Sequence, residues 1–216
     1  MILQADKKKL LVVSTDYFHP TRFRLHYLLP YLRNAFAVTL LMGAYARKSK
    51  DLVVIRTPFP GIIPAGLYLL LRALSAAFVL RFRRMYYGFD FCLATPHISG
   101  LCALLAKMPL PVIYEDVDRC EFLLKGLLSR RIMRFVEGYC IRNSDEVISA
   151  GYALTRSAQE MRKGMVHCVP NGIDVQLFEN SAERSGITKG EARLVYIGLI
   201  DAWSGLDVVI RALWIA

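Results

Sequence analysis

The strongest constraint on the fold of this 216-residue chain is an alternation between short apolar, β-branched runs and longer segments with helical periodicity. Such alternation is typical of β-α-β units and predicts an α/β, Rossmann-like parallel sheet with helices on both faces. We expect strands at 10–14, 37–42, 52–56, 91–94, 112–114, 146–149 and 165–169. We expect helices at 22–34, 65–86, 99–107, 127–142 and 153–163.

The composition changes after Phe178, and this change predicts a domain boundary. Just before it lies VHCVPNGIDVQLF, in which Asn-Gly favours a turn with positive φ and Pro170 fixes the entry to that turn. The polar stretch ENSAERSGITKGEA then indicates a linker, after which RLVYIG, LIDAWSG and LDVVIRALWIA predict a strand, a loop and a helix. We therefore expect a first domain over 1–175, a linker over 176–191, and the incomplete start of a second Rossmann-like domain over 192–216.

The net charge of +10 comes entirely from the first half of the chain. Residues 1–110 hold 15 Lys and Arg against 4 Asp and Glu, whereas residues 111–216 hold 13 against 14. Such a basic half attracts anionic lipid headgroups, phosphorylated substrates or nucleic acid, or it is simply a solvated face. The five cysteines show no zinc-like spacing, and we interpret them as reduced core residues of a cytoplasmic protein.

One apolar segment, Ile62 to Leu80, has the length of a membrane span but carries Arg72 near its middle. A central arginine costs about 2.5–3.5 kcal/mol on insertion scales, so a helix at the membrane interface fits better than a span. The continuation to Tyr87 mixes cations with aromatic rings, as expected where acyl chains meet headgroups. An ordinary core helix with a basic end is the alternative interpretation.

The loops after the strands hold the candidate site residues, because ligands bind at the carboxyl ends of parallel strands. After the first strand, Arg22 lies near a helix start, where a cation suits phosphate or is merely solvated. His97 is expected in a loop ahead of a helix, where an imidazole can take or donate a proton. Glu115, Asp116 and Asp118 crowd the end of the next strand and should raise one another's pKa values, unless one of them caps the following helix.

Four motifs in a fixed order resemble a known family. VIYEDVD, NSDEVISAGYALTRSAQE, VHCVPNGIDVQLF and RLVYIGLIDAWSGLDVVIRAL make nearly the whole chain similar to retaining glycosyltransferases of family four, which have the GT-B fold. The piece VPNGIDVQLF resembles the family's Asn-Gly-Val/Ile-Asp element followed by Phe, which leads out of the first domain. Members carry two facing Rossmann-like domains, of which the first mainly binds the acceptor and the second mainly binds a nucleotide-sugar donor.

The resemblance implies roles for individual residues. It implies a catalytic or donor-contacting role for His97 and an acceptor-site role for Asp116 or Asp118. Gly198 matches the glycine that opens the first loop of the second domain, and Arg22 stands in the loop where members commonly have Gly-Gly. Leu199 and Ser204 stand where many members have the Arg and Lys that hold the donor diphosphate, so the usual donor mode is in doubt.

The resemblance also implies a reaction and a location. The intact enzyme would transfer a hexose from a nucleotide sugar to a lipid-linked or saccharide acceptor, in polysaccharide, glycolipid or glycoprotein assembly. It would work at the cytoplasmic face of the cell membrane, peripherally bound, and would need no metal or other cofactor. We expect the 216 residues alone to be inactive, because most of the donor-binding domain is missing from them.

A non-catalytic membrane-binding or scaffolding domain that kept this fold is the competing hypothesis. Leu199 and Ser204 favour it, whereas the polar residues of the strand-end loops favour an enzyme. Nucleic-acid binding is supported only by the charge, because the sequence contains none of the recognised nucleic-acid-binding motifs. We therefore expect no nucleic-acid partner.

Overall fold

The structure is a computed structural model that describes residues 7–14, 24–43, 52–55, 65–119, 124, 126–172, 194–197, 200 and 204–215. The chain divides into two compact units, residues 1–171 and residues 172–216.

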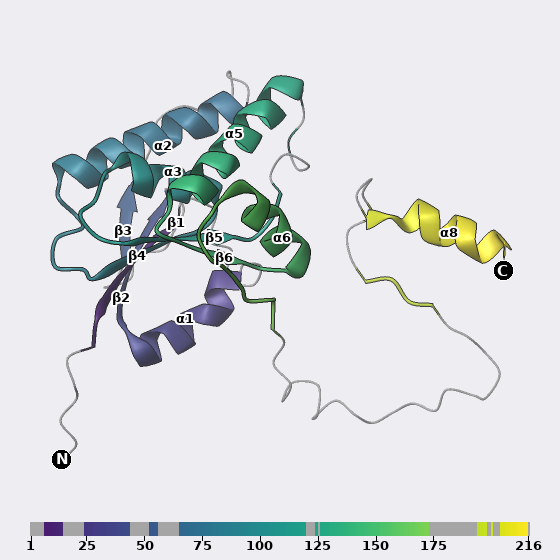
Figure 1. Ribbon diagram of the computed structural model, residues 1–216, viewed down its shortest axis with the longest axis horizontal. Helices are drawn as coiled ribbons and strands as arrows, with labels where there is room; N and C mark the ends of the chain where they lie inside the picture. Colours follow the sequence, from purple (N-terminus) through teal and green to yellow (C-terminus); the bar gives the residue numbers. More distant parts are fainter. Residues whose placement is uncertain are drawn as a thin grey trace, which may run out of the picture. The chain divides into compact units, whose positions relative to one another are not determined.

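The first unit is built on a parallel sheet of seven described strands in the order β3-β2-β1-β4-β5-β6-β7. Figure 1 shows these strands side by side in the middle of the unit. Their bounds are β1 Lys9–Ser14, β2 Ala37–Gly43, β3 Leu52–Ile55, β4 Phe91–Ala94, β5 Val112–Asp116, β6 Glu146–Ser149 and β7 Val166–Cys168. The order reverses direction between β1 and β4, which is the switch point at which Rossmann-like sheets bind ligands.

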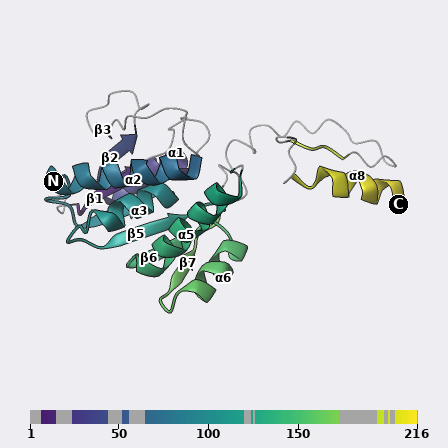
Figure 2. The same ribbon diagram turned by 90° about the horizontal axis from the view of Figure 1, so that it is seen from above.

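Helices cover both faces of the sheet, as predicted. The helical bounds are α1 Arg24–Ala35, α2 Ala65–Phe82, α3 His97–Leu105, α5 Leu127–Asn143 and α6 Tyr152–Met161. Figure 1 shows α1 on one face, with α2, α3 and α5 grouped on the other, and Figure 2 shows the latter group from above. Because β1 lies between these two layers, it is buried along five consecutive residues, Leu10 to Ser14, and does not alternate between buried and exposed positions.

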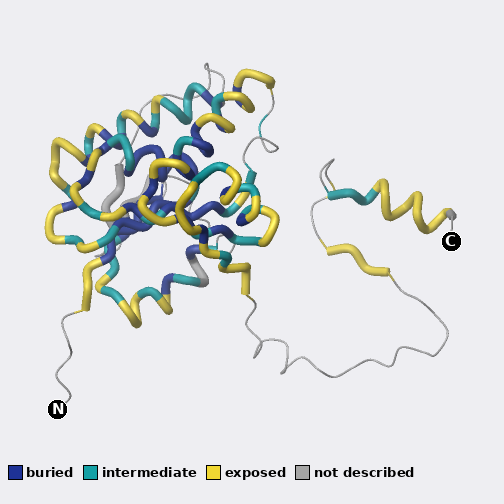
Figure 3. Tube along the Cα trace, in the orientation of Figure 1, coloured by how far each residue is buried: buried dark blue, intermediate teal, exposed yellow. Residues whose placement is uncertain are grey.

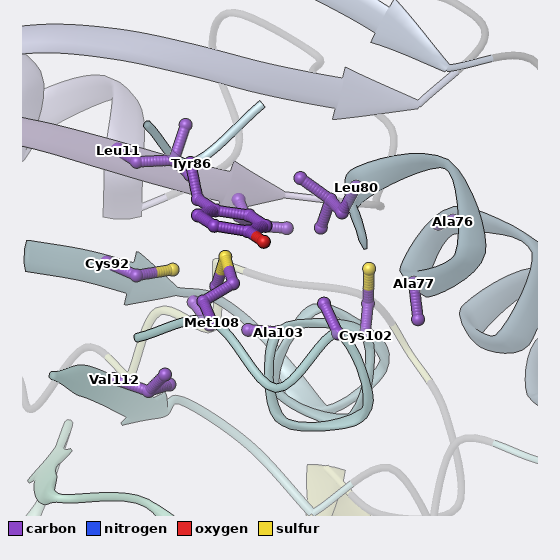
Figure 4. Close-up of a cluster of buried hydrophobic side chains, with 13 residues drawn as sticks. Leu11, Ala76, Ala77, Leu80, Tyr86, Cys92, Cys102, Ala103, Met108 and Val112 are labelled. Carbon is purple, nitrogen blue, oxygen red and sulfur yellow. The ribbon is translucent and has the colours of Figure 1, made fainter. Parts of the chain in front are cut away.

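The core is divided by the sheet. Leu10, Val12 and Leu40 pack against α1, whereas Leu11 and Val13 face the opposite layer. Figure 4 shows the latter side, where Leu11 lies beside Tyr86 in the same cluster as Leu80 of α2 and Cys102 of α3. Figure 3 shows the buried residues in dark blue at the centre of the unit and exposed residues on the outer sides of the helices.

The cysteines that the structure describes are free thiols, and three of them lie in this core. Burial raises the pKa of Cys102 to about 12, so that thiol stays neutral and inert. Burial raises the pKa of Cys92 and Cys140 as well, and adjacent thiol and carboxyl groups add to it. Cys120 lies outside the described residues.

In the first unit the predicted elements agree with the structure in type and order, and the main difference is where α2 ends. The sequence predicts a helix to residue 86, but α2 ends at Phe82. There the backbone of Arg84 takes a positive φ of 49°, the Met85 N–H donates to the Leu80 carbonyl, and the Arg84 N–H donates to the Arg81 carbonyl. This is the hydrogen-bond pattern of a Schellman motif, which stops a helix even though no glycine marks the position.

The described part of the second unit holds one helix, α8 Leu206–Ile215, where the sequence predicts one. Residues 194–197, predicted as a strand, carry no strand assignment, and their apolar side chains are exposed. A strand is assigned only where a neighbouring strand pairs with it, and no described residue of this unit is assigned to a strand. The proposed division into a domain, a linker and the start of a second domain stays a prediction.

Candidate functional site

The carboxyl ends of the parallel strands meet at one edge of the sheet, and polar side chains gather there on both of its faces. Strand β5 ends in Glu115 and Asp116, which are both buried. Successive residues of a strand point to opposite faces, so these two carboxylates lie in different layers. Each of them therefore has its own set of partners.

On the α1 face, Glu115 pairs with the first residue of α1. The Arg24 Nε donates to Glu115 Oε1 over 2.7 Å, and the side chains are only 8% and 2% exposed. The Arg24 Nη1 donates to Asn171 Oδ1 over 2.9 Å. One guanidinium thus joins the start of α1, the end of β5 and the segment that follows β7.

On the other face, Asp116 lies beside a second arginine. The Arg119 Nη1 is 3.9 Å from Asp116 Oδ2, and the same guanidinium pairs with Glu137 of α5. Ser149, at the end of β6, is the register partner of Asp116 and is also fully buried. Two carboxylates, a hydroxyl and one arginine therefore share this part of the edge.

His97 is buried beneath this second cluster and does not lie in a loop. It is the first residue of α3, and its side chain is 1% exposed, which corrects the prediction of a loop position. Its Nδ1 is 2.5 Å from the Tyr114 hydroxyl, and its carbonyl accepts from the Cys140 thiol. Gly100 permits this packing, because a Cβ there would meet the Tyr114 ring at 2.8 Å and the Cys140 sulfur at 2.9 Å.

The shifted pKa values follow from burial. Burial raises the pKa of Asp116 to about 6 from an ordinary 3.8, while Arg119 and Ser149 act in the opposite direction. Asp118 adds only a small increase, so mutual repulsion among carboxylates, the predicted cause, is wrong as the main cause. Burial, assisted by Arg119, lowers the pKa of His97 to about 4, so the imidazole is neutral near pH 7.

Several buried polar atoms at this edge have no hydrogen-bond partner among the residues that the structure describes. The clearest of them are Arg24 Nη2 and Glu115 Oε2, whereas Asp116 interacts with the Ser149 hydroxyl and His97 with the backbone of Asp118. Buried polar atoms are nearly always satisfied in folded proteins, and an exception calls for a water, an ion or a ligand. Their concentration at the switch-point edge marks it as the candidate site.

The remaining predicted residues are not gathered into this cluster. Asp118 is exposed, and its Oδ1 accepts from the neighbouring Arg119 N–H over 2.7 Å. Arg22 and Gly198 lie outside the described residues, as does Leu199. Ser204 belongs to the second unit.

The structure adds Arg24, Glu137 and Asn171, which sequence reasoning did not select, and it separates Glu115 from the other carboxylates expected at the strand end. Arg24 has no local signal beyond its place near the start of a helix, and Asn171 reads as a turn residue. Glu137 has the stronger signal, because it is the lone acidic residue of its helix and shares a face with the buried side chains of Met133, Cys140 and Ile141. A carboxylate on a buried helix face needs a positive partner, which here is Arg119.

A hollow of about 540 Å³ lies at the opposite, amino-terminal edge of the sheet, lined by Lys9, Arg33, Phe36, Tyr87 and their neighbours. It is remote from the cluster along the strands, since Lys9 begins β1 and the cluster lies beyond the strand ends. Within the described residues, no group of three or more His, Cys, Asp or Glu side chains is placed to hold a metal ion.

A scan against models of protein families finds no match, and neither does a sequence search of curated proteins. Solved structures match the fold. Sucrose-phosphate synthase from Thermosynechococcus elongatus gives a TM-score of 0.56 at 13% identity, over 79% of this chain and 50% of that chain. A shorter chain of the same synthase gives 0.55 at 15% identity, over 80% and 94% of the two chains.

UDP-N-acetylglucosamine 2-epimerase from Rickettsia bellii gives a TM-score of 0.51 at 11% identity, over 76% of this chain and 45% of that chain. This chain spans about half the length of the epimerase and of the longer synthase chain. At these identities the likeness concerns the fold. The first unit is an α/β sheet flanked by helices that resembles a Rossmann-like domain of the GT-B class.

Proposed function

We propose that the first unit is the acceptor-side domain of a retaining GT-B glycosyltransferase, which transfers a hexose from a nucleotide sugar to a saccharide or lipid-linked acceptor. The observation that carries this proposal is the group of buried polar atoms without partners at the switch-point edge. Both donors and acceptors are present there, so the edge suits sugar hydroxyls, which donate and accept at once. The names of two fold neighbours, a sucrose-phosphate synthase and a UDP-N-acetylglucosamine 2-epimerase, are compatible with nucleotide-sugar chemistry.

Asp116 is the residue best suited to move a proton. With a pKa of about 6, its carboxylate is largely ionised near neutral pH yet remains basic enough to accept a hydroxyl proton. His97 stays neutral, and its Nε2 can donate or accept according to the tautomer that the Tyr114 hydroxyl imposes on Nδ1. Asp118 stays a candidate for contact with the acceptor from its exposed position. Arg22 and Gly198 stay candidates for contact with the donor.

Saccharide binding by the purified 216-residue protein tests the proposal. Sucrose and UDP-glucose serve as probes in isothermal titration, with Asp116→Asn as the variant and Glu160→Gln, an exposed helical position, as the matched control. We expect sucrose to bind, Asp116→Asn to weaken the binding at least tenfold, and the control to bind as the unchanged protein does. Absence of sucrose binding would contradict the proposal. We also expect no sugar transfer by these residues alone.

The outer face of α2 supports a membrane partner. Leu71, Leu74, Phe78 and Phe82 form one stripe along the helix, and their exposed fractions rise from 39% to 70%. The inner side of α2 is apolar as well, and a helix that is apolar all round is normally covered on all sides. The exposed Arg83 and Arg84 follow the stripe, which makes an anionic membrane surface the best complement. No helix in the described residues is long and apolar enough to cross a membrane.

We therefore include peripheral attachment to the cytoplasmic face of the cell membrane in the proposal. Vesicles of phosphatidylcholine with and without phosphatidylglycerol test it by co-sedimentation. The double variant Phe78→Ser, Phe82→Ser should lose binding to the anionic vesicles, whereas Tyr31→Ser, equally exposed but on α1, should keep it. If the double variant instead converts a dimer to a monomer without affecting vesicle binding, a second copy covers α2 and the membrane proposal is wrong.

The same exposed stripe also favours the second candidate function, a non-catalytic membrane scaffold with this fold. The two candidates differ in what they require of the polar cluster. A scaffold should bind vesicles and should show no saccharide binding that depends on Asp116. An enzyme domain should show both kinds of binding, each lost through its own variant.

A further inference from the structure

The Arg24 guanidinium is held at two points and is free at a third. Its Nε donates to Glu115 Oε1 over 2.7 Å, and its Nη1 donates to Asn171 Oδ1 over 2.9 Å. Its Nη2 is buried and has no hydrogen-bond partner among the described residues. Two anchored nitrogens fix the plane of a guanidinium, so the direction of the third nitrogen is fixed as well.

Glu115 offers a matching free atom. Oε2 of this carboxylate is buried without a hydrogen-bond partner in the part of the chain that the structure describes, while Oε1 is occupied by Arg24. The two side chains are 92% and 98% buried, as their exposed fractions of 8% and 2% show. A buried N–H and a buried carboxylate oxygen, both without partners, therefore belong to one ion pair at the candidate site.

The charge of this pair determines which ligand it suits. The carboxylate compensates the guanidinium, so the pair attracts an anion much less than an unpaired arginine would. A phosphate dianion could accept from Nη2, but its two negative charges would be repelled by the Glu115 carboxylate. A hydroxyl group accepts from the arginine and donates to the carboxylate, so it satisfies both atoms at once.

We infer that Arg24 and Glu115 form a seat for a hydroxyl group of a saccharide, with Asn171 as the residue that positions the guanidinium. This inference rests on the proposed function, whose acceptor it describes more closely. It also departs from the expectation of a phosphate site at the start of α1. In the sequence, Glu115 lies 91 positions after Arg24, and Asn171 lies 147 positions after it. Asn171 is also the last residue of the first unit.

The inference predicts that Glu115→Gln changes the preferred ligand from a neutral saccharide toward phosphate, and a titration with both ligands tests this. Methyl α-D-glucopyranoside and inorganic phosphate are titrated into the ¹⁵N-labelled 216-residue protein, and amide and arginine Nε signals are followed by NMR. The unchanged protein should bind the glucoside at Arg24 and should not bind phosphate there. Glu115→Gln should bind the glucoside at least about tenfold more weakly and should gain phosphate binding, because Arg24 has lost its compensating charge. Glu160→Gln should behave like the unchanged protein.

Two further variants guard against a folding defect in Glu115→Gln. Asn171→Ala removes only the outer anchor and should weaken glucoside binding about threefold to tenfold without admitting phosphate. Arg24→Lys keeps the charge but loses the planar fork, and it should weaken glucoside binding by about tenfold or more. If both variants bind the glucoside with unchanged affinity, Arg24 does not bind the saccharide hydroxyl group and the inference is wrong.

The outcome also separates this inference from the proposed function. Glucoside-induced shifts confined to Asp116, Ser149 and their neighbours, and lost in Asp116→Asn, would overturn the seat and leave the proposed function standing. Phosphate binding to the unchanged protein at Arg24 would overturn the seat in the same way. Absence of glucoside shifts anywhere in the protein would overturn the seat, and absence of both glucoside and sucrose binding would overturn the proposed function as well.

Discussion

Glu115 and Asp116 are consecutive residues of β5, yet each pairs with a different arginine on a different face of the sheet. Glu115 meets Arg24 at 2.7 Å on the α1 face, and Asp116 lies 3.9 Å from Arg119 on the face that carries α3 and α5. The alternation of side chains along a strand separates the two charges, so a dipeptide that reads as one acidic cluster forms two sites.

Removing one partner of the Arg24–Glu115 pair should lower the free energy of unfolding, because the other charge is then buried alone. Arg24→Met leaves a buried carboxylate uncompensated, and we expect the free energy of unfolding to fall by about 3 kcal/mol or more. The double variant Arg24→Met, Glu115→Leu should recover most of that loss, because it removes both charges. Urea denaturation measures the four proteins of this cycle. An unfolding free energy that Arg24→Met leaves unchanged would show that the Glu115 carboxylate is solvated and that the two charges do not form a buried pair.

Asp116 and His97 should affect the pH dependence of stability in opposite directions. The raised pKa of Asp116 means that the folded state binds the proton more tightly, so this group lowers stability as pH rises from about 4 to 6. The lowered pKa of His97 means that the folded state binds its proton less tightly, so this group raises stability over the same range. Their effects should nearly cancel in the unchanged protein.

Variants that lack one of the two groups should therefore show the pH dependence of stability that the other group causes. Asp116→Asn should make stability rise between pH 4.5 and 6 by about 1.4 kcal/mol per pH unit, and His97→Asn should make it fall at a similar rate. Urea midpoints measured across that range for both variants check this, with Glu160→Gln as an exposed control. Parallel curves for all four proteins would mean that neither group is desolvated as described.

Gly100 should not tolerate a methyl group. Its Cβ would lie 2.8 Å from the Tyr114 ring and 2.9 Å from the Cys140 sulfur, which are both fully buried. We expect Gly100→Ala to lower the free energy of unfolding by about 1–3 kcal/mol through overpacking. Gly151→Ala is the matched control, since nothing lies within 4 Å of a Cβ there. Equal stability of the two variants would contradict the packing of α3 against β5.

Arg162 should stabilise the end of α5. Its Nη1 donates to the Ile141 and Ser144 carbonyls, and its Nη2 donates to the Asp145 carbonyl. These groups lie at the carboxyl end of a helix, where a cation also favours the helix dipole. We expect Arg162→Met to cost about 1–3 kcal/mol of unfolding free energy. Arg156→Met, whose side chain is 86% exposed, should cost under about 1 kcal/mol.

The elements of this fold could be predicted from the sequence because their signals are local. Runs such as KLLVVS and FCLA are too apolar and too short for surface helices, so they read as strands buried on both faces. The end of α2 could not be read in this way, because Arg84 adopts the positive φ that usually calls for glycine. Residues 194–197 were equally apolar, yet a strand needs a neighbour that no local pattern supplies.

The same distinction between local signals and tertiary contacts applies to the candidate site. The sequence alone determined that polar residues would follow β5, since a parallel sheet brings its strand ends to one edge. Only the tertiary structure decided that Glu115 meets Arg24 and Asn171, that His97 is buried against Tyr114, and that Asp118 stays exposed. The physical reason is that desolvation and pairing depend on segments far apart in the chain, and these acquire neighbours only when the sheet and its helix layers pack together.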